Sequence, residues 1–166
     1  MIMKRVLYPG SFDPITKGHM NIIDQASNMF DEIIVVVMKN INKTNYFFNY
    51  EERVNIIKEL YKDNKKIKVI TGLGATVDIA LENNCCGIIR GLRSLTDYNY
   101  EVEMQQFNKE ISNNKINTVC FFADKEYQFI SSTVVKEILN LGKDISRYVD
   151  PYVEKRLILK RGESYE

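Results

Sequence analysis

Residues 32–38, EIIVVVM, are the most informative segment for the fold: every position from Ile33 to Met38 is apolar, and the first five of these are β-branched. A strand that is apolar at consecutive positions must be covered on both faces, which is typical of a parallel sheet. This is also the longest purely apolar run, and it is far shorter than the ~20 residues that span a bilayer. The segment therefore predicts a buried strand of a parallel sheet and no membrane-spanning helix.

On either side of this strand, short apolar runs and helical patterns alternate along the chain. Four further runs predict strands at residues 5–8, 67–71, 87–90 and 118–122. Apolar residues at three- and four-residue spacing, together with capping signals, predict helices at residues 17–30, 50–61, 76–82, 97–112, 131–141 and 151–159. The alternation implies right-handed βαβ connections. We therefore predict an α/β fold, a Rossmann-like open five-stranded parallel sheet with helices on both faces.

Length and composition predict a single domain, which we place at residues 1–166. A chain of 166 residues with 45% hydrophobic and 27% charged residues is ordinary for one folded globular unit. Lys+Arg 23 against Asp+Glu 22 leaves a formal charge of +1, so the chain lacks the broad basic face that nucleic-acid binding needs. We therefore expect no nucleic-acid partner.

The three cysteines, Cys85, Cys86 and Cys120, are an odd number without C-x-x-C spacing. This argues against a disulfide framework or a zinc site, and it favours small buried apolar residues in a reducing compartment. The N-terminus has no apolar stretch of signal-peptide length. We therefore expect a cytoplasmic protein.

The loop after the first predicted strand carries the chemistry: residues 8–19, YPGSFDPITKGH. The pattern G-x-x-x-x-G-K-[ST] is absent, and the only near match to G-x-G-x-x-G, at Gly72, follows the third strand and lacks its last glycine. Gly18 lets the backbone approach a ligand closely. His19, the only histidine, falls in the first turn of a helix, where free N–H groups and the helix dipole favour an anion. Ligands bind at the carboxyl ends of parallel strands, so this loop predicts a site for an anionic ligand.

Two motifs in this order resemble the nucleotidyltransferase superfamily. TKGH at residues 16–19 matches its [HT]-x-G-H signature, and ISST at residues 130–133 matches its second signature at the start of a late helix. Further segments resemble the bacterial phosphopantetheine adenylyltransferase family: YPGSFDP at 8–14, EER at 51–53, IRGLR at 89–93, DYNYE at 97–101 and KEYQFISS at 125–132. The resemblance runs from residue 4 to about residue 151.

The resemblance implies transfer of AMP from ATP to 4′-phosphopantetheine, which gives dephospho-coenzyme A and pyrophosphate in coenzyme A biosynthesis. It further implies Mg²⁺ carried with ATP, a homohexamer, and coenzyme A as a candidate feedback ligand. The attacking group is a phosphate with a second pKa near ~6, so the reaction needs no general base. Catalysis then depends on positioning and on positive charge. Since the sequence has no carboxylate cluster of metal-ligand spacing, we expect no metal site made by the protein alone.

The resemblance also implies roles for individual residues. His19, Lys43 and Arg90 are the implied catalytic residues: His19 stabilises the transition state at the α-phosphate, and Lys43 and Arg90 clamp the phosphate of the acceptor. We count these three, with Arg93, as the cations of the site. The implied acceptor-binding residues are Ser11, Lys43, Thr76 and Arg90. The implied ATP-binding residues are Ser11, Phe12, His19, Gly91, Leu92, Arg93, Glu101, Tyr127, Gln128, Phe129, Ile130, Ser131, Ser132 and Thr133.

Other interpretations stay open at this point. A nucleotidyltransferase acting on nicotinate mononucleotide or glycerol phosphate shares the first motif, although residues 90–93 and 97–101 favour pantetheine. A non-catalytic nucleotide-binding regulator could keep the fold and lose turnover. Locally, Lys43 is also consistent with a solvated loop lysine, and Arg93 with an ion pair to Asp97 or Glu101. Residues 130–133 are also consistent with a helix N-cap alone.

Overall fold

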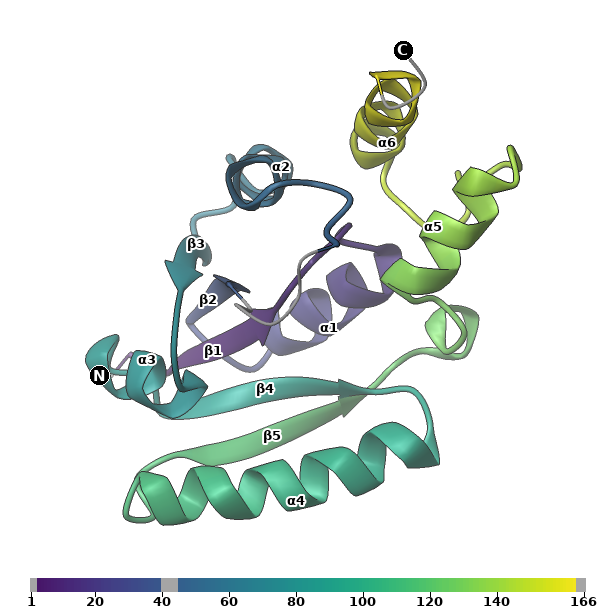
Figure 1. Cartoon of the computed structure of the whole chain (residues 1–166). Coiled ribbons are helices and arrows are strands. Elements are labelled where there is room, and N and C mark those ends of the chain that lie inside the picture. Colours follow the sequence, from purple (N-terminus) through teal and green to yellow (C-terminus); the bar gives the residue numbers. More distant parts are fainter. Residues whose placement is uncertain (1–2, 40–44, 164–166) are drawn as a thin grey trace.

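The computed structural model describes residues 3–39 and 45–163 of the chain, and Figure 1 shows its arrangement. The strands are β1 (Arg5–Gly10), β2 (Glu32–Met38), β3 (Ile67–Gly72), β4 (Gly87–Leu92) and β5 (Asn117–Phe122). The helices are α1 (Lys17–Ser27), α2 (Tyr50–Leu60), α3 (Thr76–Glu82), α4 (Leu95–Ile111), α5 (Ser132–Asn140) and α6 (Pro151–Glu163), with a 3-10 turn η1 (Lys125–Tyr127).

The five strands form one parallel sheet in the order β3-β2-β1-β4-β5. β1 is central: β2 and β3 add on one side of it, and β4 and β5 on the other. β1 pairs with β2 over the whole length of β1, from Arg5 opposite Glu32 to Gly10 opposite Val37. The predicted Rossmann-like α/β fold is confirmed.

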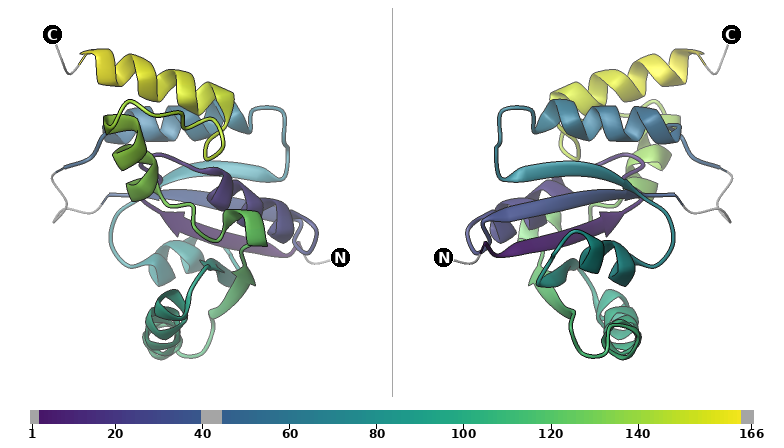
Figure 2. Two further views of the ribbon diagram at one scale, coloured as in Figure 1. Left: turned by 90° about the vertical axis from the view of Figure 1, so that its right-hand side faces the viewer. Right: turned by 90° about the vertical axis from the view of Figure 1, so that its left-hand side faces the viewer.

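The apolar run of β2 is buried from both sides, as its sequence predicts. Val35 and Val37 belong to a core that includes residues of α1, α2, α5 and α6, whereas Ile34 and Val36 belong to a second core with α3. Figure 2 shows α6 lying over α2 on one side of the sheet and α4 on the opposite side. The consecutive apolar residues therefore alternate between two cores, which is why none of them faces water.

The ends of several helices differ from the prediction. α1 ends at Ser27 rather than at residue 30, because Asn28 caps it and the chain turns there, with the Phe30 N–H bonded to the Ala26 carbonyl. α4 begins at Leu95, two residues early, because Ser94 is its N-cap and its side chain accepts the Asp97 N–H. The turn η1 has no apolar periodicity, so no pattern in the sequence predicts it.

Two of the three cysteines lie in a different environment from the one that the sequence predicts. Cys85 is buried as expected, but Cys86 and Cys120 are exposed. Cys86 precedes β4 in a loop, and Cys120 lies on β5, an edge strand of the sheet. No helix within the described ranges is long and apolar enough to cross a membrane.

The sheet opens at the carboxyl ends of its central strands. β1 and β4 pair at Val6–Gly87 and Leu7–Ile88, and the pairing stops there. Beyond it, the Pro9 carbonyl accepts a hydrogen bond from Arg90 Nη1 at 3.1 Å. In a strand, the N–H and C=O of one residue point toward the same neighbouring strand. The N–H that Pro9 lacks would therefore point toward β4, where the pairing with β1 has already ended. A proline in a central strand thus helps to part β1 from β4.

Candidate active site

A cavity of about 240 Å³ lies where β1 and β4 part, at the point of the sheet where the strand order reverses. Open α/β sheets bind their ligands at this position. Many of the residues predicted from the sequence line it: Ser11, Phe12, His19, Arg90, Gly91, Arg93 and Ile130. Residues far apart in the chain therefore meet in one cavity.

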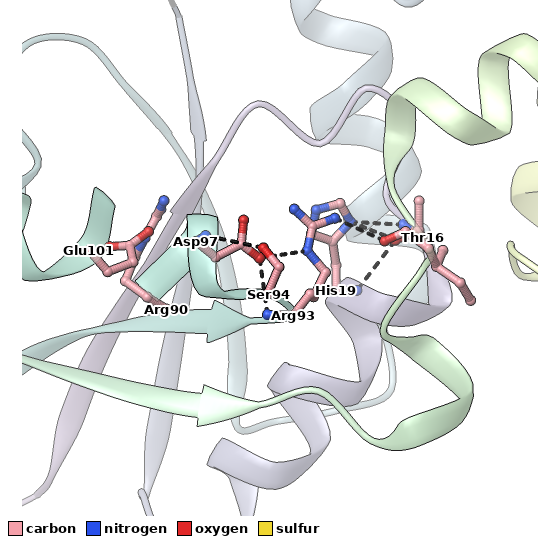
Figure 3. Close-up of polar contacts among 8 residues, drawn as sticks. Thr16, His19, Arg90, Arg93, Ser94, Asp97 and Glu101 are labelled. Atoms are coloured by element: carbon pink, nitrogen blue, oxygen red, sulfur yellow. Dashed lines mark hydrogen bonds and ion pairs between the residues drawn. The ribbon is translucent and has the colours of Figure 1, made fainter. Parts of the chain in front are cut away.

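His19 stands in the first turn of α1, and a reciprocal cap fixes its ring. The Thr16 side chain accepts the His19 backbone N–H at 3.4 Å, and the Thr16 backbone N–H donates to His19 Nδ1 at 3.0 Å. Nδ1 is therefore an acceptor, which places the proton of the neutral ring on Nε2. The cap, drawn in Figure 3, sets both the orientation and the tautomer of the imidazole.

The charge state of His19 corrects the expectation that it is a cation. Burial, followed by the positive charges of Arg93 and Arg90, lowers the pKa of His19 to about 4. The ring is therefore neutral at neutral pH in this structure. It contributes an N–H donor to the site, and the positive charge comes from the two arginines.

Arg90 is held from two sides at the end of β4. Its Nε donates to Glu101 Oε1 on α4 at 2.6 Å, and its Nη1 donates to the Pro9 carbonyl at 3.1 Å. No described residue accepts from Nη2, so that end of the planar fork remains available to a ligand. Glu101 is buried and does not line the first cavity, so the structure pairs it with Arg90. Its implied contact with ATP stays a prediction.

Arg93 joins the loop after β4 to the segment before α5. Its Nε lies 3.2 Å from Asp97 Oδ2, and its Nη1 donates to the Ile130 carbonyl at 3.0 Å. The interpretation that Arg93 pairs with Asp97, as Figure 3 shows, is therefore correct. The arginine also lines the cavity. Arg93 therefore makes a structural ion pair and lines the site at the same time.

The serines at the start of α5 already have partners in the protein. Ser131 is the N-cap of α5 and its Oγ accepts the Val134 N–H at 3.1 Å, while Ser132 Oγ donates to the Pro14 carbonyl at 2.8 Å. The capping interpretation thus holds for Ser131. What this helix start offers an anion is its main-chain N–H groups and its dipole.

Several predicted residues lie away from the first cavity. Leu92 is buried at the end of β4, and Gln128, Phe129 and Thr133 are exposed, Phe129 at 86%. Tyr127 lines a neighbouring cavity of about 270 Å³, which shares Ile130 with the first. Lys43 lies outside the described residues, so its contact with the acceptor phosphate stays a prediction.

Thr76 lies in a further cavity, of about 90 Å³, between α3 and α4. Arg90 lines both this cavity and the first, so it stands between them. Tyr100, Met104 and Asn108 of α4 also line it and were not predicted as site residues. Their i, i+4, i+8 spacing, one face of a helix, is the signal that could have found them.

The comparisons with known proteins agree with this architecture. The model of the family described as Cytidylyltransferase-like matches residues 7–138. Two solved structures share the fold. A lipopolysaccharide core biosynthesis protein from Thermoplasma volcanium GSS1 covers 74% of this chain and 98% of its own, at 23% identity and a TM-score of 0.56. A structure from Vibrio parahaemolyticus covers 97% of this chain and 94% of its own, at 21% identity and a TM-score of 0.67. The fold and the position of the site thus define a cytidylyltransferase-like nucleotidyltransferase.

Curated relatives identify one family within this class of nucleotidyltransferases. The chain is 41% identical over 155 residues to the phosphopantetheine adenylyltransferase of Syntrophomonas wolfei, a match that covers 93% of this chain and 95% of the relative. It is 44% identical over 154 residues to the enzyme of that name from Leptospira biflexa, with the same coverage. It is 40% identical to that of Fusobacterium nucleatum, over 98% and 99% of the two chains. The chain belongs to the phosphopantetheine adenylyltransferase family.

Proposed function

We propose that this protein transfers the adenylyl group of ATP to 4′-phosphopantetheine, which yields dephospho-coenzyme A and pyrophosphate. The observation that carries the proposal is the meeting of His19, Arg90 and Arg93 at one cavity in a chain of this family. An N–H donor and two guanidinium groups suit a reaction between two anions, because such a reaction is limited by charge and position.

The bond changes of this reaction need no residue that removes a proton. An oxygen of the acceptor phosphate uses a lone pair to form a bond to the α-phosphorus of ATP. The bond from that phosphorus to the bridging oxygen breaks, and the electron pair leaves with pyrophosphate. No proton is transferred in this step. Neutral His19 therefore serves as a hydrogen-bond donor to the α-phosphate, with most effect where charge accumulates in the transition state.

The acceptor site is built around Arg90. Its carboxylate partner Glu101 and the Pro9 carbonyl orient the guanidinium, whose remaining N–H groups can grip a phosphate. The neighbouring cavity with Thr76, Met104 and Asn108 fits the pantetheine arm, because it opens beside the same arginine and mixes apolar with hydrogen-bonding side chains. Lys43 is proposed as the second clamp on the phosphate.

Mg²⁺ enters as part of the nucleotide substrate in this proposal. Among the residues that the structure describes, no group of three His, Cys, Asp or Glu side chains is placed to hold a metal ion. Mg²⁺ takes oxygen ligands and keeps water and substrate phosphates in its shell, so ATP itself supplies its principal ligands. Coenzyme A as a feedback ligand and the cytoplasmic location stay predictions.

The proposal also includes a homohexamer, and α4 with β5 is the surface that supports it. Large apolar side chains are exposed on both elements: Leu95, Tyr98, Val102, Phe107 and Ile111 on α4 and Phe122 on β5, with exposures between 44% and 83%. Large apolar side chains exposed in this number on neighbouring elements are typical of protein–protein contacts. We assign this surface to a second copy of the chain.

Pyrophosphate release with ATP and a panel of acceptors tests the reaction. We expect turnover with 4′-phosphopantetheine and none with nicotinate mononucleotide or glycerol 3-phosphate. A preference for either of those acceptors would favour another member of the superfamily, and no turnover with any acceptor would favour a binding protein.

Titrating the two forms of pantetheine against wild type and Arg90→Ala tests the acceptor site. The substitution should weaken binding of the phosphorylated form, whereas unphosphorylated pantetheine should bind both proteins equally. Equal losses for the two forms would show that Arg90 supports the fold or the arm rather than the phosphate.

A further inference from the structure

Arg53 of α2 is a buried cation that the proposed reaction does not yet use. The residue is 2% exposed, and none of the ion pairs among the described residues includes it. Its guanidinium carbon lies 4.0 Å from the centre of the Tyr46 ring. Its Nη1 donates to the Ser11 carbonyl at 2.6 Å and its Nε to the Asn49 carbonyl at 3.4 Å. A guanidinium buried this deeply is tolerated when its donors are satisfied, and here a short bond satisfies one of them on the loop after β1.

That bond fixes the direction of one peptide group. The peptide bond between Ser11 and Phe12 is trans, and the C=O and N–H of a trans peptide point in opposite directions. With the Ser11 carbonyl turned toward Arg53, the Phe12 N–H points away from it. No residue within the described ranges accepts this N–H, and both Ser11 and Phe12 line the cavity that holds His19 and Arg90. A main-chain N–H at a cavity wall with no protein partner is suited to bind an anion.

Packing of its ring keeps Phe12 in the backbone conformation that this orientation of the Ser11–Phe12 peptide group requires. Its φ is +47°, in the left-handed region that an aromatic residue rarely occupies. The ring is held edge to face against Tyr8 and against His19, with centroid distances of 5.4 Å and 5.1 Å. A Cβ at Gly10 would lie 2.9 Å from Phe12 Cζ, so only glycine leaves room for the ring. The packed ring and the Arg53 bond therefore hold the same short segment from two sides.

We propose that Arg53 is a positioning residue for the adenylyl transfer. It holds the Ser11–Phe12 peptide so that the Phe12 N–H donates to an oxygen of the transferred phosphate, and it keeps a positive charge behind that loop. The inference rests on the proposed function and adds to it a group that acts through the main chain and not on the substrate directly.

Arg53→Lys tests the positioning role, with Glu52→Ala as the matched control on the same helix. Lysine keeps the charge but cannot bond both carbonyls from one rigid fork. We expect kcat to fall about 10- to 100-fold, with the KM of ATP and of the acceptor changed less than about threefold, since the misplaced donor acts in the transition state. Glu52→Ala removes the ion pair to Lys160 and the contact to the Asn49 N–H, so it should lower the Tm while kcat stays within about twofold.

The outcomes separate this inference from the proposed function. Wild-type kcat in folded Arg53→Lys, or losses of kcat that follow the loss of Tm equally in both variants, would overturn the positioning role. If wild type itself does not turn over with ATP and 4′-phosphopantetheine, the proposed function fails.

A measurement on the wild-type protein covers the case in which Arg53→Lys does not fold. The chain contains a single Ser–Phe peptide bond, Ser11–Phe12. Protein labelled with carbonyl-¹³C serine and ¹⁵N phenylalanine therefore gives one coupled amide signal, from the peptide group in question. With Mg²⁺ and ATP but no acceptor, the Phe12 amide proton should move downfield and exchange more slowly with water. An amide that stays unchanged on saturation with ATP would overturn the inference.

Discussion

At the scale of single residues, the lowered pKa of His19 can be tested directly. Burial and two arginines lower its pKa to about 4 from its usual 6.5. Because it is the only histidine, the imidazole signals in a ¹³C NMR titration belong to it alone. We expect a titration midpoint near pH 4 in the ligand-free protein, and a higher midpoint in Arg93→Met, which removes one of the two charges. A midpoint near 6.5 in wild type would contradict the neutral, donating ring.

The lowered pKa of His19 also makes the free energy of unfolding depend on pH. Between about pH 4 and pH 6.5 the unfolded chain binds a proton at His19 that the folded protein excludes. The contribution of His19 to the free energy of unfolding is therefore fully present above pH 6.5 and is lost as the pH falls toward 4.

Replacing His19 by alanine should lower kcat much more than it raises either KM. A donor that acts in the transition state typically contributes about 10²–10³ in rate. His19→Asn is the companion variant, because its amide can donate a hydrogen bond but does not titrate. Steady-state kinetics of the two purified proteins is the measurement, with circular dichroism as the check on folding. Turnover of His19→Ala close to that of wild type would remove His19 from the mechanism.

At the scale of elements, a pair of hydrogen bonds connects α1 to the segment after β5. Asn21 Nδ2 donates to Asp124 Oδ2 at 2.6 Å, and Asn21 Oδ1 accepts the Asp124 N–H at 3.1 Å. Gln25, one turn along α1, donates to the Phe122 carbonyl at 2.9 Å. This attachment places the start of η1 and the residues toward Ile130 against the helix that carries His19.

Asn21→Asp should therefore destabilise the protein at neutral pH. It sets a second carboxylate beside Asp124 and removes the amide donor, for an expected loss of about 1–3 kcal/mol of unfolding free energy. Denaturant unfolding at neutral and acid pH is the measurement, and the loss should shrink at acid pH as the carboxylates take up protons. Asn55→Asp, an exposed site on α2, should change stability by less than about 0.5 kcal/mol. Equal losses at the two pH values would mean that repulsion between the carboxylates is not the cause.

At the scale of the whole molecule, the apolar surface of α4 and β5 predicts the assembly. We expect light scattering after size exclusion to give the mass of six chains for wild type. Phe107→Glu should give smaller species, because a charge would be buried against apolar groups of the neighbouring copy. Leu159→Glu, an apolar-to-acidic change at a 56% exposed position of α6, should leave the hexamer intact. A wild-type monomer, or an unchanged mass for Phe107→Glu, would contradict the assignment of this surface.

The layers of this protein can be predicted from local sequence patterns, because its strand and helix signals each extend over only a few residues. Residues 32–38 are apolar at consecutive positions, and that pattern predicted cover on both faces and a parallel sheet. The motifs at 16–19 and 130–133 predicted a site at the carboxyl ends of strands. Even the cap between Thr16 and His19 is local, since the two residues are three apart on one helix turn.

The chemistry inside that site, by contrast, depends on contacts that form only when the chain folds. The neutral state of His19 depends on burial and on Arg90 and Arg93, which β4 and the loop after it bring from about seventy residues away. The orientation of Arg90 depends on Glu101 and on the break in pairing between β1 and β4. Arg53 gave no sign of its contact with Ser11, because neither charge nor periodicity on α2 reveals which carbonyl lies opposite. Local propensity acts over a few residues, whereas burial and long-range hydrogen bonds are fixed only when the sheet assembles.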